Sequence, residues 1–171
     1  MDLAHKSKIA AFIASLTAFL LLPPLFPFLR LFFFAPFLII LYYQKNYIST
    51  LWISFVCGLI LDLFSTPFFP GMNSLIYTVT TAILYHQRHY FFSDRLSTLP
   101  LMTFFFSLVA TLLFFILVYG WGGKLNLSLN LIYTDLLAMP ALDGIYGFFL
   151  FVFPSLIFGK RRRRSKEYFA R

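Results

Sequence analysis

Residues 57–74 have the sequence CGLILDLFSTPFFPGMNS, which places one carboxylate inside an apolar run and then interrupts the chain. The carboxylate is Asp62, and the interruption is made by Pro67, Pro70 and Gly71. A carboxylate that faces lipid is costly, so Asp62 must face protein, water or a partner. This stretch therefore predicts a helix, a tight turn and a second helix, with a buried polar contact between them.

Gly58 lies four residues before Asp62 and shares its helix face, so another backbone can approach closely there. The free N–H groups of the next helix, at Gly71 to Ser74, are the natural partners of the carboxylate. We therefore predict that Asp62 caps a helical hairpin. The alternatives are substrate or proton handling, and contact with another protein.

The composition indicates an integral membrane protein. Of the 171 residues, 60% are hydrophobic and 12% are charged, and the mean hydropathy is +0.82. A soluble domain of this length needs a larger polar shell. We predict one all-α membrane domain over residues 1–171. The single cysteine, Cys57, excludes an intramolecular disulfide and is expected to be a small buried side chain.

Apolar runs predict about six transmembrane helices in one bundle. Their approximate ranges are 9–22, 31–43, 47–64, 73–85, 99–119 and 135–158. The first run is expected to be retained and to end at the proline cluster that begins at Pro23, and the second is short for a full span. Pro140 is expected to bend the sixth helix.

The distribution of basic residues predicts the topology. With six spans, every Lys and Arg except Arg30 and Lys124 falls on one side, which the positive-inside rule makes the cytoplasm. Both termini are then cytoplasmic, and the turn at 65–71 is outside. The tail at 159–171 is expected to contact anionic lipid headgroups rather than nucleic acid, through Lys160, Arg161, Arg162, Arg163 and Arg164. Docking of a cytoplasmic protein is the alternative for this tail.

The same topology predicts that Asp62, Asn73, Asp135 and Asp143 gather in the outer half of the bundle. Asp135, beside Thr134 at a helix start, is expected to serve as an end-cap.

Enzymatic motifs are weak or missing, so no catalytic residue, cofactor or metal site is predicted. The stretch HYFFSD, residues 89–94, has the His-x4-Asp spacing of glycerolipid acyltransferases but no companion glycine-rich motif. His86 and His89 are spaced as a metal pair without further ligands, and a solvated interfacial loop is the favoured interpretation.

The stretch GLILDLFSTPFFPGMNSL, residues 58–75, resembles the Gly-x-x-x-Asp helix, turn and glycine-opened helix of the rod shape-determining protein MreD family. Its proline-rich turn differs from the commoner small-residue version. Chain length, number of spans and the Arg-rich end also match in outline. The architecture is similar to that of energy-coupling-factor transporter substrate-binding subunits.

The resemblance implies a non-enzymatic scaffold subunit of the bacterial cell-wall elongation complex in the inner membrane. It would bind a single-span MreC-like protein and, through it, MreB filaments and peptidoglycan synthases. The alternative is a vitamin-type transporter subunit with a pocket among Asp62, Asp135 and Asp143. The candidate structural or partner-contact residues are Gly58, Asp62, Pro67, Gly71, Asn73, Asp135, Pro140 and Asp143. Gly144 and Gly147 are expected to offer a close-approach surface to another helix.

Overall fold

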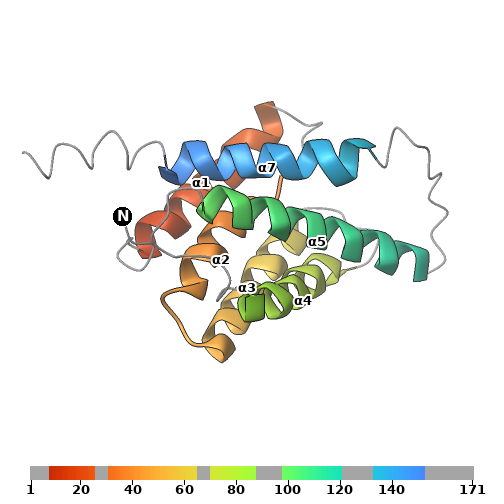
Figure 1. Ribbon diagram of the computed structural model, residues 1–171, viewed down its shortest axis with the longest axis horizontal. Helices are drawn as coiled ribbons and strands as arrows, with labels where there is room; N and C mark the ends of the chain where they lie inside the picture. Colours follow the sequence, from red (N-terminus) through yellow and green to blue (C-terminus); the bar gives the residue numbers. More distant parts are fainter. Residues whose placement is uncertain (1–7, 26–30, 65–69, 88–97, 121–132, 153–171) are drawn as a thin grey trace, which may run out of the picture.

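The protein is helical throughout the part of the chain that the computed structural model describes, which is residues 8–25, 31–64, 70–87, 98–120 and 133–152 (Figure 1). Five α-helices come first: α1 (Lys8–Leu25), α2 (Ala35–Tyr42), α3 (Tyr47–Phe64), α4 (Met72–Gln87) and α5 (Thr98–Gly120). The last segment joins a π-helical turn η3 (Thr134–Ala138), α7 (Met139–Gly147) and a second π-helical turn η4 (Phe148–Val152). The predicted all-α class is confirmed for these residues.

Three of the described helices are long and apolar enough to cross a membrane. They are Tyr47–Phe64, Thr98–Gly120 and Thr134–Val152, and Lys8–Pro24 is a shorter apolar helix. Many of their large apolar side chains face outward, as expected when the surrounding solvent is lipid. These helices indicate an integral membrane protein.

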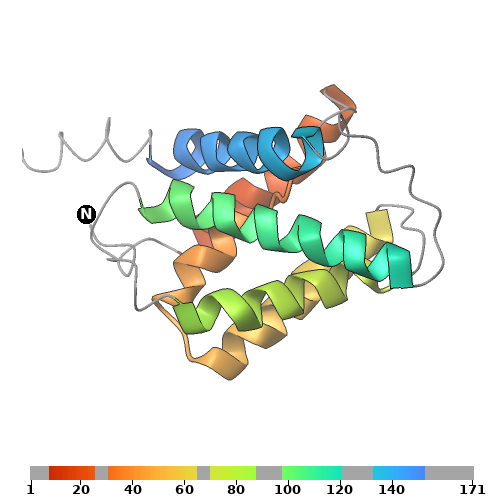
Figure 2. The ribbon, with the colours of Figure 1, turned by 45° about the vertical axis from the view of Figure 1, so that its right-hand side comes forward.

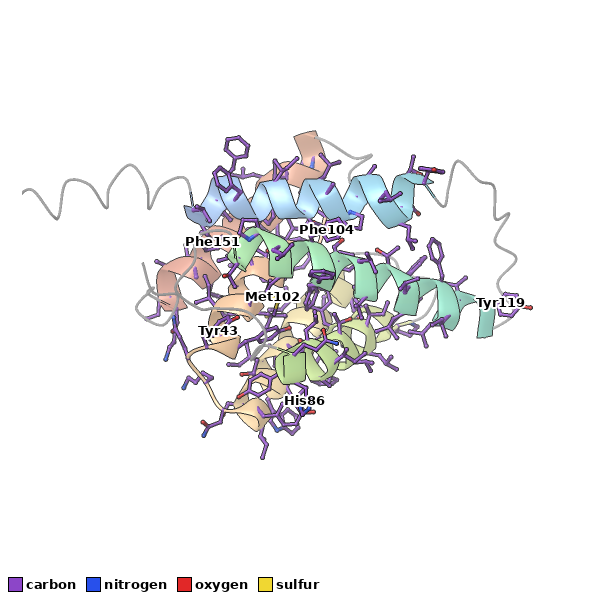
Figure 3. The ribbon with its side chains drawn as sticks, in the orientation of Figure 1. Tyr43, His86, Met102, Phe104, Tyr119 and Phe151 are labelled. Carbon is purple, nitrogen blue, oxygen red and sulfur yellow. The ribbon has the colours of Figure 1, made fainter. Side chains whose placement is uncertain are left out.

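α5 lies between α7 on one side and the α3–α4 pair on the other, as both ribbon views show (Figures 1 and 2). α3 packs most extensively against α4, and α5 against α7. α2 lies in the interior, where it contacts α1, α3 and α5. α5 has buried and exposed side chains: Met102 is fully buried, whereas Tyr119 extends from the end of the helix (Figure 3).

The second apolar run, predicted as a span over 31–43, contains only a short helix, α2. α2 has eight residues, which at the α-helical rise make it about 12 Å long, far less than a bilayer core. Every residue of α2 is buried. Its apolar character on all sides therefore reflects enclosure by other helices and not contact with lipid.

The predicted end of the first helix changes. α1 continues through Pro23 and Pro24 to Leu25, although the first helix was predicted to end at the prolines. The fixed φ angle of proline fits a helical backbone, so prolines in the final turn cost hydrogen bonds without ending the helix there. α4 has 16 residues and a Ser- and Thr-containing face, and it is not among the three span-length apolar helices.

Pro140 has a local effect on the last helix. A π-helical turn lies immediately before it, with the N–H of Met139 bonded to the carbonyl of Thr134. The helix nevertheless continues as one segment, Thr134–Val152. The widened turn thus lies beside a residue that has no N–H to donate, and the bend at Pro140 stays a prediction.

Buried hydroxyls connect α2, α3 and α4. The Ser54 hydroxyl donates to the carbonyl of Tyr77 (2.8 Å) and lies 2.7 Å from the hydroxyl of Thr81. The Tyr42 hydroxyl donates to the Thr81 oxygen at 3.3 Å. Such hydrogen bonds hold helices together where apolar packing alone gives little preference over lipid.

Candidate functional site: two aspartates that bind backbone N–H groups

Asp62 binds the start of α4. Its two carboxylate oxygens accept hydrogen bonds from the N–H groups of Asn73 (3.0 Å) and Ser74 (3.1 Å). These N–H groups belong to the first turn of α4, where no intrahelical acceptor is available and the helix dipole favours negative charge. The predicted contact between Asp62 and the N–H groups at Gly71–Ser74 is confirmed.

The turn before α4 depends on Gly71, whose φ of +85° is a left-handed conformation that side chains disfavour. The Ser74 hydroxyl donates to the carbonyl of Gly71 at 2.8 Å and closes the same turn. Met72 and Ser74 are buried, so the turn packs against the protein. These contacts give the hairpin a defined geometry at the Asp62 end.

Gly58 brings the two backbones together, as predicted. A Cβ atom at Gly58 would lie 2.3 Å from the Cα of Ser74 and 2.9 Å from the carbonyl oxygen of Asn73. Real Cβ contacts are never this short with backbone, so no larger residue fits without separating α3 from α4. Gly58 and Asp62 therefore bind the same turn from one face of α3.

Asp143 forms the second site, on α7, and it is fully buried, with 0% of its surface exposed. Its Oδ1 accepts a hydrogen bond from the N–H of Phe32 at 2.9 Å, and its Oδ2 is hydrogen-bonded to the Ser107 hydroxyl of α5. The carboxyl group thereby joins α7, α5 and the segment that precedes α2. Neither partner was predicted from the sequence.

Tyr146 binds the same segment one turn along α7. Its hydroxyl donates to the carbonyl of Phe33 at 3.2 Å, and its ring packs against the Phe33 ring with centroids 6.0 Å apart. Asp143 and Tyr146 therefore satisfy an N–H and a C=O of the non-helical residues 31–34. Irregular backbone among apolar spans is tolerated where protein supplies such partners. We call this set (Asp143, Ser107, Tyr146 and the backbone of Phe32 and Phe33) the α7 clasp.

Gly144 and Gly147 face α5 of the same chain and are both buried. A Cβ at Gly147 would lie 2.8 Å from the Thr103 hydroxyl, and one at Gly144 would lie 3.3 Å from the carbonyl of Pro100. The expectation that these glycines offer a surface to another helix is wrong for a partner, because the close approach is internal.

The gathering of the acidic side chains in the outer half of the bundle stays a prediction, and the hydrogen bonds show two separate sets of partners. Asp62 and Asn73 meet, whereas Asp143 has separate partners on α5 and before α2. Asp135 lies in the first turn of η3, whose capping residue is Tyr133 and makes no side-chain cap. Within the described ranges, no three His, Cys, Asp or Glu side chains are arranged to hold a metal ion.

Several predicted features lie outside the described residues: Pro67, the tail with Lys160, Arg161, Arg162, Arg163 and Arg164, residues 153–158 of the sixth run, and the 89–94 motif. His86 is described and is exposed at the last turn of α4 (Figure 3).

Ser107 is a site residue that the sequence analysis missed, although a signal for it exists. Thr103, Ser107 and Thr111 recur every four residues along α5 and are all buried. A polar stripe on one face of an otherwise apolar span predicts an interhelical contact. No comparable signal marks Phe32, because its contribution comes from a backbone N–H.

Comparison of the chain with protein-family models, with curated proteins and with solved structures finds no match.

Proposed function

We propose that the chain is a non-enzymatic scaffold subunit of the bacterial cell-wall elongation (rod-shape) complex, located in the inner membrane. It would bind a single-span MreC-like protein and, through that protein, MreB filaments and peptidoglycan synthases. One observation carries the proposal: Gly58 and Asp62, the residues on which the MreD resemblance rests, hold the α3–α4 hairpin together. A motif used for rigidity suits a scaffold better than an active site.

The hairpin presents an apolar face on which a partner helix can pack. Ile48, Trp52 and Val56 recur every four residues along α3, and Leu63 follows two turns later on the same face. They are 69%, 65%, 50% and 84% exposed. They lie away from the buried positions at Ser54, Cys57, Gly58 and Leu61. Lipid covers this face in the isolated chain, and we propose that the single-span partner covers it in the complex.

The distribution of Lys and Arg supports a multi-pass topology with both termini in the cytoplasm. In this topology the second predicted span, 31–43, contains α2. Contact of the basic tail with anionic lipid belongs to the same proposal.

Photo-cross-linking in cells tests the partner and the face together. A photoreactive residue at Trp52 should capture a single-span membrane protein. The matched control is Ile116 on α5, which is 64% exposed and so equally accessible. Capture at Trp52 but not at Ile116, followed by identification of a single-span periplasmic protein, is the expected result.

Two outcomes would contradict the proposal. Equal capture at Trp52 and Ile116 would mean that α3 has no preferred partner. Purification with a bound small molecule and no protein partner would favour the vitamin-type transporter subunit instead.

A further inference from the structure

The hydrogen-bond partners of the two aspartates differ in whether they can accept as well as donate a hydrogen bond. At Asp62 both oxygens face backbone N–H groups, which only donate, so both oxygens must accept. A carboxyl group with two accepting oxygens therefore fits the hydrogen bonds at Asp62.

At Asp143 the partners are of two kinds. Oδ1 faces the Phe32 N–H and must accept, whereas Oδ2 faces the Ser107 hydroxyl, which can donate or accept. A neutral carboxylic acid satisfies both contacts: its carbonyl oxygen accepts from Phe32, and its O–H donates to Ser107. Ser107 can then direct its own proton to the carbonyl four residues earlier, as Thr103 and Thr111 already do on the same helix.

The surroundings of Asp143 offer no compensating charge among the described residues. The side chain is 0% exposed, and the described cationic side chains, Lys8, Lys45 and His86, are all exposed at the surface. The titratable groups within electrostatic range are the hydroxyls of Tyr77 on α4 and Tyr146 on α7, both neutral at physiological pH. α5 contributes the hydroxyl of Ser107. An isolated buried carboxylate is costly unless it is paired or takes up a proton.

From these contacts we propose that Asp143 is a proton-binding site. The folded protein holds this side chain as a neutral acid, and the bound proton completes the hydrogen bond between α7 and α5. The carboxylate takes up one proton at Oδ2 and loses its charge, so the α7 clasp holds residues 31–34 without a buried ion. The inference does not depend on the proposed function.

Infrared spectroscopy of the full-length protein in detergent at neutral pH tests the proposal directly. A protonated carboxyl has a carbonyl stretch that an ionised carboxylate lacks, and exchange into D2O shifts it. The wild type should show this band, Asp143→Asn should lose it, and the control Asp62→Asn should keep it. Ser107→Ala should shift the band, because the acid O–H loses its acceptor.

Thermal unfolding supplies a second measurement. An asparagine at 143 presents an oxygen to Phe32 and an N–H to Ser107, the same pattern as the neutral acid, so Asp143→Asn should keep the wild-type midpoint. An asparagine at 62 turns its amide N–H toward a backbone N–H, so Asp62→Asn should unfold at a lower temperature.

Absence of the band from the wild type, or its persistence in Asp143→Asn, would overturn the proposal, as would failure of Asp143→Asn to fold. Appearance of the band only in Arg30→Gln would also overturn it, because Asp143 would then be an ionised partner of that arginine.

Discussion

Asp62 and Asp143 both accept hydrogen bonds from backbone N–H groups, but their partners lie at different distances along the chain. Asp62 binds N–H groups 11 and 12 residues later, whereas Asp143 binds an N–H 111 residues earlier and a hydroxyl 36 residues earlier. Asp62 is partly exposed and Asp143 is fully buried. Both side chains satisfy backbone donors at or near the start of a helix.

The difference shows which part of the fold each contact stabilises. The Asp62 contact needs a turn of the right length and a glycine at position 58, so it can form as soon as α3 and α4 meet. The α7 clasp exists when α7, α5 and the residues before α2 are all in place. Disrupting the first should separate one hairpin, whereas disrupting the second should release the buried short helix α2.

The largest effect is expected for Gly58→Leu. Even the first side-chain atom would lie 2.3 Å from the backbone of Ser74, so α3 and α4 must separate and the Asp62 hydrogen bonds must break. We expect a loss of about 3 kcal/mol or more, at the upper end of overpacking effects. Size-exclusion chromatography after heating measures the fraction of protein that stays folded. The control is Gly120→Leu, because nothing lies within 4 Å of a Cβ at Gly120. Equal behaviour of the two variants would show that the hairpin contact is dispensable.

Next is Asp143→Leu, which leaves the Phe32 N–H unsatisfied in the interior. A buried unpaired donor costs about 1–3 kcal/mol, and the loss of the Ser107 contact adds to this. Limited proteolysis and thermal unfolding in detergent should both show destabilisation, with cleavage appearing near residues 31–34. A thermal midpoint equal to that of the wild type would contradict the role given to the clasp.

Asp62→Leu should cost less than Asp143→Leu, because water can partly replace the lost acceptor at a partly exposed site. We expect about 1–2 kcal/mol, within the range for lost helix caps. Asp62→Asn should retain more folded protein than Asp62→Leu, since one amide oxygen still accepts. Membrane-expression levels of the two variants measure this order, and equal loss of both would contradict the capping interpretation.

The smallest effect is expected for Tyr146→Phe. It removes the hydroxyl that donates to the Phe33 carbonyl but keeps the ring packing, so the loss should be about 0.5–1.5 kcal/mol. Tyr119→Phe, at a side chain 78% exposed, should leave the thermal midpoint unchanged. An unchanged midpoint for Tyr146→Phe would show that the clasp does not depend on the Tyr146 hydroxyl.

The hairpin was predictable because its information is local. Gly58, Asp62 and Gly71 lie within 14 residues of one another, and their spacing on a helix and in a turn follows from backbone geometry. The two ends of α3 were also predicted, at Tyr47 and Phe64, because polar or turn residues flank a predominantly apolar run. The end of α1 was not predicted, since two consecutive prolines favour a helix end in sequence while α1 accommodates them in its last turn.

The sequence by itself determined that the chain is an α-helical membrane protein and that Asp62 meets the start of the following helix. Apolar content and local spacing are sufficient for both conclusions, because lipid demands helices and a short turn restricts the possible partners. Only the tertiary structure decided that α2 is a short enclosed helix, that Gly144 and Gly147 face α5, and that Asp143 binds Phe32 and Ser107. The physical reason is that an apolar residue gives the same sequence pattern against lipid as against protein, and the sequence does not indicate which distant backbone N–H a buried carboxyl group will meet.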